Sequence, residues 1–204
     1  MNRRAMALTF RSLLVAAAAS CTFALAACGG APSEKAPLEG AAIGGDFTLT
    51  GKDGKPVRYA DFAGKYRIMY FGYTFCPDVC PVDLLNIAQG VKLFGKAHGD
   101  AAARIQPIFI TIDPERDTPE VVGKYAANFG TSVVGLSGSP SQIAAVAKQW
   151  AVFYQKRDGG SPKDYLMDHS RAAYLMGPAG EPIALLPAEQ GAQAVATDLA
   201  KWVR

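Results

Sequence analysis

The chain alternates between short apolar runs and segments in which apolar residues recur at helical spacing. Apolar runs predict strands, and nearly unbroken ones such as 66–73 indicate strands covered on both faces. The predicted strands cover residues 47–49, 57–59, 66–73, 105–112, 133–136, 171–176 and 183–186. Three helices are predicted to begin at Pro81, Pro119 and Pro140, and a fourth is predicted over residues 192–199. Residues 158–162 are predicted to form a loop.

The order of these elements predicts the fold class. Strands alternate with helices along most of the chain, and a hairpin and a last helix follow. This order is typical of an α/β domain with a central mixed sheet flanked by helices, which we place over residues 46–204. Two cysteines at the first main strand-to-helix turn make the predicted fold thioredoxin-like.

The first 45 residues differ from this domain. Arginines precede a mostly apolar run over 13–27, which is the pattern of a secretory signal peptide over residues 1–27. The run ends in Leu25-Ala-Ala-Cys28, which resembles a bacterial lipobox and predicts a lipid on Cys28 that anchors the protein on the periplasmic side of a membrane. Cleavage of an ordinary signal peptide near Ala27 is the alternative. Residues 28–45, rich in Gly, Ala and Pro, predict a flexible linker.

Removal of the predicted signal peptide would change the net charge of the chain and the number of its free cysteines. Residues 1–27 hold three arginines and no acid, so the formal net charge falls from +3 to zero. A neutral net charge gives no indication of a nucleic-acid partner, because binding to phosphates requires a basic face on the protein. Cleavage also removes Cys21, and lipid would occupy Cys28. Cys76 and Cys80 then remain as free thiols in an oxidising compartment, where they can form a disulfide.

The two thiols lie in Cys76-Pro-Asp-Val-Cys80-Pro81, directly before a predicted helix. Pro81 suits the first helical position, so Cys80 would lie near the N-cap. There the helix dipole and the free N–H groups favour a thiolate. Asp78, between the thiols, could tune the affinity for a metal from outside the ligand set or could serve the turn alone. Two buried, inert cysteines are the alternative to a functional pair.

Three motifs together resemble the Sco/SenC family of copper-binding assembly proteins over residues 44–203. They are Cys76-Pro-Asp-Val-Cys80-Pro81, Thr111-Ile-Asp-Pro-Glu-Arg-Asp-Thr118 and Asp168-His-Ser170. The resemblance implies a thioredoxin-like fold that binds copper through Cys76, Cys80 and His169. It also implies a role in delivering copper to, or preparing the thiols of, the binuclear copper site in a subunit of cytochrome c oxidase.

The residue types agree with that ligand set. Two thiolates and an imidazole form a soft set that suits copper, whereas structural zinc takes four ligands. His98, at a predicted helix C-terminus, needs no role beyond a favourable contact with the helix dipole. Asp113 and Asp117 are interpreted as loop and cap residues, with Asp117 or Thr118 capping the helix that begins at Pro119.

Other functions remain open at this stage. A thiol-disulfide oxidoreductase needs only the two cysteines and one thiolate of lowered pKa. The spacing of Cys76 and Cys80 is one residue longer than in thioredoxins, and no proline immediately precedes the strand at 171–176. Thr74-Phe-Cys-Pro resembles the peroxiredoxin pattern only in part. A copper or redox sensor would carry the same residues as a copper carrier.

Overall fold

The computed structural model describes residues 34–130, 132–161 and 164–204. The strands are β1 (Thr48–Thr50), β2 (Pro56–Arg58), β3 (Tyr66–Gly72), β4 (Ile105–Thr111), β5 (Val134–Leu136), β6 (Tyr154–Ser161), β7 (Asp164–His169), β8 (Ala173–Met176) and β9 (Pro182–Leu186). The helices are α2 (Val79–His98), α3 (Pro119–Ala127), α4 (Pro140–Gln149) and α5 (Ala192–Trp202). Three short 3₁₀ segments are η1 (Tyr59–Phe62), η2 (Gly99–Arg104) and η3 (Ala188–Gln190).

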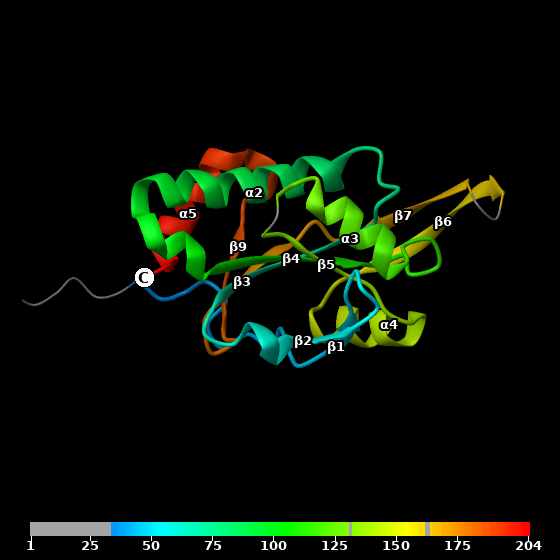
Figure 1. Cartoon of the computed structure of the whole chain (residues 1–204), viewed down its shortest axis with the longest axis horizontal. Coiled ribbons are helices and arrows are strands. Elements are labelled where there is room, and N and C mark those ends of the chain that lie inside the picture. Colours follow the sequence, from blue (N-terminus) through cyan, green and yellow to red (C-terminus); the bar gives the residue numbers. More distant parts are fainter. Residues whose placement is uncertain (1–33, 131, 162–163) are drawn as a thin grey trace, which may run out of the picture. The chain divides into compact units, whose positions relative to one another are not determined.

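A five-stranded sheet in the order β5-β4-β3-β8-β9 forms the centre of the domain (Figure 1). β3, β4 and β5 run parallel, whereas β8 pairs antiparallel with both β3 and β9. All seven residues of β3 and of β4 are buried, as their continuous apolar sequences predict. The predicted central mixed sheet is therefore confirmed.

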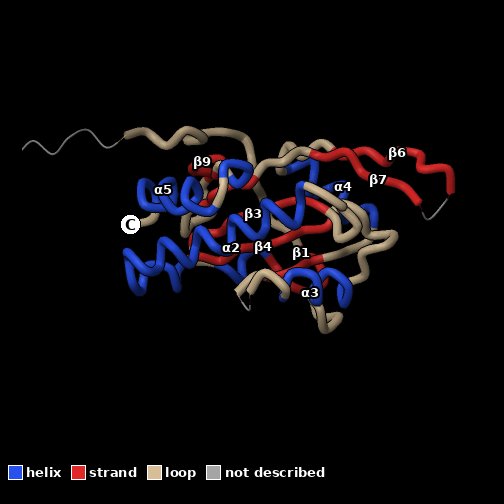
Figure 2. Tube along the Cα trace, turned by 90° about the horizontal axis from the view of Figure 1, so that it is seen from above, coloured by secondary structure: helices blue, strands red, loops and turns tan. Residues whose placement is uncertain are grey.

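Helices cover both faces of this sheet. Since successive residues of a strand point to opposite faces, the contacts of neighbouring residues show which helix lies on which face. Tyr70 of β3 donates a hydrogen bond to Asp83 of α2 at 2.9 Å, whereas its neighbour Phe71 packs against Trp150 at the end of α4. Phe109 of β4 stacks on Tyr70 and also contacts Tyr125 of α3. α2 and α3 therefore share one face and α4 covers the other, with α5 beside α2 (Figures 1 and 2).

The helix starts follow the predicted capping chemistry with one difference. Ser139 and Gln142 form a capping box ahead of α4, and the Thr118 side chain, rather than Asp117, caps α3 by accepting from the backbone N–H of Val121. α2 begins at Val79, two residues before the predicted Pro81. Proline fits this third position as well, because the N–H groups of the first turn have no partner within the helix.

The β6–β7 hairpin corrects the predicted loop at 158–162. β6 continues to Ser161 and pairs antiparallel with β7, in a register that places Tyr154 opposite His169. The turn-forming residues of this segment disfavour a strand locally, but pairing with β7 outweighs that preference. The hairpin extends away from the central sheet (Figures 1 and 2).

The C-terminal part of the predicted linker is packed chain. Ala36, Leu38 and Ile43 lie against the hydrophobic core, and the backbone N–H of Leu38 donates to Ile183 of β9 at 2.9 Å. Apolar side chains spaced among the Gly and Pro residues of 36–45 give this segment a surface to bury. The predicted signal peptide at 1–27 and Cys28 lie outside the described residues.

Candidate metal centre

The connection from β3 to α2 brings the two thiols together. Cys80 lies in the first turn of α2 and is fully buried, and Cys76 lies in the preceding loop and is half-buried. The backbone N–H of Cys80 points at the Cys76 Sγ, 3.5 Å away. Gly72, the last residue of β3, leaves the space that Cys80 fills, since a Cβ there would stand 2.8 Å from the Cys80 Sγ.

The two thiols differ in their acidity. A hydrogen bond from the Cys80 side chain, helped by the backbone N–H groups of Asp78, Val79 and Cys80, lowers the pKa of Cys76 to about 4. The same hydrogen bond, together with burial, raises the pKa of Cys80 well above its usual range. The predicted effect of the helix start is therefore present but falls on Cys76. The reason is that α2 begins earlier than predicted, so its first N–H groups point back at Cys76.

His169 completes a three-residue group at the end of β7. Its Nε2 lies 3.2 Å from the Cys80 Sγ, and its Nδ1 lies 2.9 Å from the carbonyl oxygen of Ser170. Because a carbonyl can only accept, Nδ1 carries the proton in the neutral ring, which leaves Nε2 free to bind a cation. The Tyr73 ring meets the imidazole edge-on, with the ring centroids 5.9 Å apart, and fixes its orientation.

The ligand atoms of Cys76, Cys80 and His169 all lie within 4.8 Å of one another, and we call these residues the Cys–His cluster. They come from a loop, a helix and a hairpin strand. β8 begins four residues after His169 and pairs with β3, which explains how residues far apart in the chain meet. The donor set, two sulfurs and one imidazole nitrogen, is soft, which favours copper.

A model of the family described as SCO1/SenC matches residues 35–204. The chain belongs to the SCO1/SenC family. It is 43% identical over 138 residues to the Arabidopsis thaliana "Protein SCO1 homolog 1, mitochondrial", which covers 68% of this chain and 40% of that protein. The chain spans between 40% and 61% of the length of eight such curated relatives.

Solved structures of the SCO1/SenC family share the fold. Copper-bound ScoI from Bradyrhizobium japonicum is 38% identical, with a TM-score of 0.70 over 78% of this chain and 99% of that chain. Copper-bound ScoI from Arabidopsis thaliana is 36% identical, with a TM-score of 0.71 over 78% and 96% of the two chains. The resemblance to the family and the thioredoxin-like α/β fold are therefore confirmed.

Two other residues considered from the sequence, His98 and Asp78, are not members of the Cys–His cluster. His98 is the last residue of α2, about 27 Å from Cys80 at 1.5 Å per residue, and stacks on Phe94. Asp78 occupies the N-cap position of α2, is exposed, and makes no capping bond with its side chain. It contributes its backbone N–H to Cys76, and an effect of its carboxylate on metal affinity stays a prediction.

An ion pair between the buried Asp83 and the partly exposed Arg171, which no sequence pattern predicted, connects α2 to the segment after His169. The Asp83 carboxylate is 1% exposed and accepts two hydrogen bonds from Arg171, at 2.7 and 3.0 Å, besides the one from the Tyr70 hydroxyl. Asp83 follows Cys80 by three residues and Arg171 follows His169 by two. The signal available in the sequence was an acidic residue, Asp83, on the face of the predicted helix that packs inward, since buried acids are almost always paired.

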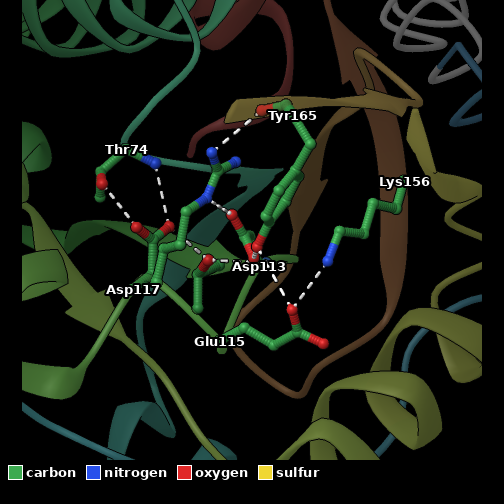
Figure 3. Close-up of polar contacts among 8 residues, drawn as sticks. Thr74, Asp113, Glu115, Asp117, Lys156 and Tyr165 are labelled. Atoms are coloured by element: carbon green, nitrogen blue, oxygen red, sulfur yellow. Dashed lines mark hydrogen bonds and ion pairs between the residues drawn. The ribbon is translucent and has the colours of Figure 1, made fainter. Parts of the chain in front are cut away.

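A second unforeseen network holds the loop before Cys76. Asp117 is fully buried and accepts hydrogen bonds from the backbone N–H and the hydroxyl of Thr74, at 2.9 and 2.5 Å (Figure 3). It also accepts from the Thr111 hydroxyl at 2.6 Å. Burial raises the pKa of Asp117, and these hydrogen bonds oppose that rise. Asp117 therefore fixes the start of the Cys76 loop instead of capping α3.

Within the part of the chain that the structure describes, none of the helices has both the length and the apolar character needed to cross a membrane.

Proposed function

We propose that this chain is a copper metallochaperone that carries one copper ion through Cys76, Cys80 and His169. The observation that carries the proposal is the convergence of two sulfur atoms and one imidazole nitrogen within 4.8 Å. Such soft donors favour copper, and the similar ScoI proteins from Bradyrhizobium japonicum and Arabidopsis thaliana have structures with copper bound. The resemblance of the three motifs supports the binuclear copper site of a cytochrome c oxidase subunit as the destination.

The cluster is arranged to receive a cation. Cys76 is half-buried and, with a pKa of about 4, is a thiolate at neutral pH, so it meets an incoming ion first. In the neutral ring of His169 the proton lies on Nδ1, which donates to the carbonyl oxygen of Ser170, so Nε2 is the nitrogen available to the ion. Cys80, whose pKa is raised, must release its proton when it binds the ion, since the thiolate is the metal ligand.

Redox state should control copper loading. Disulfide formation removes two electrons from Cys76 and Cys80 and leaves neither sulfur as a thiolate ligand. We expect the reduced protein to bind one copper ion under anaerobic conditions, and the protein oxidised with diamide, its disulfide confirmed by mass, to bind none tightly. Tight binding by the disulfide form would contradict this cluster as the copper site.

Thiol-disulfide exchange is the second candidate function. The low pKa of the accessible Cys76, with a protonated Cys80 beside it, is an arrangement in which one thiol attacks and the other resolves. The comparison of copper binding by the reduced and the oxidised protein also separates the two candidate functions. A reduced protein that binds no copper but forms the disulfide readily would leave thiol exchange as the function of this pair.

The anchoring of the chain is a separate proposal. The lipobox-like Leu25-Ala-Ala-Cys28 supports a lipid on Cys28, which would hold the domain at a membrane on the periplasmic side. We expect metabolic labelling with a radioactive fatty acid to mark the wild-type protein and not the Cys28→Ser protein. Label that persists in Cys28→Ser would exclude Cys28 as the attachment site.

A further inference from the structure

Arg116, in the loop between β4 and α3, contacts the strand that carries His169. Its Nη1 donates to the carbonyl oxygen of Tyr165 at 2.9 Å, and its guanidinium lies 3.6 Å from the centre of the Tyr165 ring. Tyr165 and His169 are four residues apart on β7, so their side chains lie on the same face of the strand. Arg116 therefore holds the His169 side of the Cys–His cluster.

The same guanidinium contacts the loop between β3 and α2 that carries Cys76, which we call the cysteine loop. It lies 4.7 Å from the centre of the Phe75 ring, and Phe75 directly precedes Cys76. It also lies 5.8 Å from the ring of Tyr73, which meets the His169 imidazole edge-on. A single side chain thus touches residues next to two members of the cluster.

Asp113 fixes Arg116 in this position. The Asp113 carboxylate is almost fully buried, lies 2.6 Å from the Arg116 Nε, and accepts a hydrogen bond from the Tyr165 hydroxyl at 2.7 Å. Figure 3 shows the Tyr165 ring reaching Asp113 with its hydroxyl end. Burial raises the pKa of Tyr165, so its hydroxyl stays protonated and remains a donor. Asp113, Arg116 and Tyr165 form a closed triangle of contacts.

Hydrogen bonding alone does not explain where the guanidinium lies. Its Nη2 is buried with no hydrogen-bond partner among the described residues, an arrangement that costs free energy. The Arg116 side chain is only 14% exposed and is surrounded by aromatic rings from β7 and from the cysteine loop. Contacts with these aromatic rings, together with the ion pair to Asp113, therefore determine the position of the Arg116 guanidinium.

We propose that Arg116 is a positioning residue for copper binding, which keeps the strand bearing His169 at a fixed distance from the loop bearing Cys76. The inference rests on the proposed copper function and adds to it a residue that is not a ligand. Residues that hydrogen-bond to the ligands of a metal site typically change affinity by about 10- to 100-fold when they are replaced, and Arg116, which acts through Tyr165 and Phe75, is expected at the lower end of that range.

The test compares Arg116→Met and Arg116→Lys with Arg58→Met, each in the wild-type and the His169→Ala background. Arg58 is a matched control, because it also pairs with an aspartate three residues away but is exposed and contacts no part of the cluster. The measurements are copper(I) affinity, by anaerobic competition with a coloured chelator, and thermal melting of the metal-free protein.

We expect Arg116→Met to weaken copper binding by about tenfold, and to leave the affinity of the His169→Ala protein unchanged. Arg116→Lys should cause a smaller loss, because an ammonium cannot contact Asp113 and Tyr165 with the geometry of a guanidinium. Arg58→Met should have no effect. If Arg116→Met fails to fold, Arg116→Lys decides the test.

Wild-type affinity in the folded Arg116 variants, or an equal loss with and without His169, would overturn the inference. Lower thermal stability with unchanged affinity would likewise show that Arg116 serves the fold alone. An unchanged affinity in His169→Ala by itself is a distinct result, because it would overturn the ligand set of the proposed function and this inference with it.

Discussion

Replacing either Cys76 or Cys80 by serine is expected to weaken copper binding by about a thousandfold, a loss of roughly 4 kcal/mol of binding free energy. Each change removes one of only two thiolates from the Cys–His cluster, and a hydroxyl is a poor ligand for a soft ion. Competition titration of the reduced proteins under anaerobic conditions measures the effect.

The two serine variants should differ in stability. Cys76 is half-buried, so Cys76→Ser should melt close to the wild-type temperature. Cys80→Ser places a hydroxyl in the closed space beside Gly72 and His169 and should melt lower. Val82→Ser, an exposed change in the same turn, is the control for copper affinity. Copper affinity in both cysteine variants equal to that of Val82→Ser would refute the copper site.

Replacing Arg171 by methionine is expected to lower the free energy of unfolding by about 3–5 kcal/mol, the usual cost of leaving a buried charge without its partner. Asp83 is 1% exposed and would keep only the hydrogen bond from Tyr70. Asp83→Asn should cost less, because the 41% exposed Arg171 side chain can turn to water. Urea unfolding of the metal-free proteins measures both effects.

A double-mutant cycle identifies the ion pair as the cause. The double variant Asp83→Asn/Arg171→Met should lose less stability than the two single changes predict when added, because it leaves no unpaired charge. Arg58→Met, which removes an exposed pair with Asp61, should leave the unfolding curve unchanged. Additive losses at Asp83 and Arg171 would show that the pair does not act as a unit.

The central sheet and the starts of α3 and α4 could be predicted because their signals are local. The continuous apolar runs of β3 and β4 and the capping box at Ser139 each lie within a few residues of sequence. The cysteine pair is equally visible. His169 needed the resemblance to the Sco/SenC family, because no local pattern says that it returns to a turn 89 residues earlier.

The supporting residues could not be predicted because their roles depend on distant partners. Asp117 serves Thr74, 43 residues away, and Asp83 serves Arg171, 88 residues away. A sequence shows that such residues carry a charge, but the partner that makes burial tolerable appears only in the fold. The same applies to β6, whose Gly and Ser residues form a strand only because β7 lies opposite.

X-ray absorption spectroscopy at the copper edge of the reduced, copper-loaded protein tests the central claim most directly. The account predicts two sulfur ligands, from Cys76 and Cys80, and one nitrogen ligand from His169. His169→Ala should lose the nitrogen signal and His98→Ala should keep it. Fewer than two sulfur ligands in the wild-type protein, or a nitrogen signal that survives His169→Ala and disappears in His98→Ala, would contradict the account.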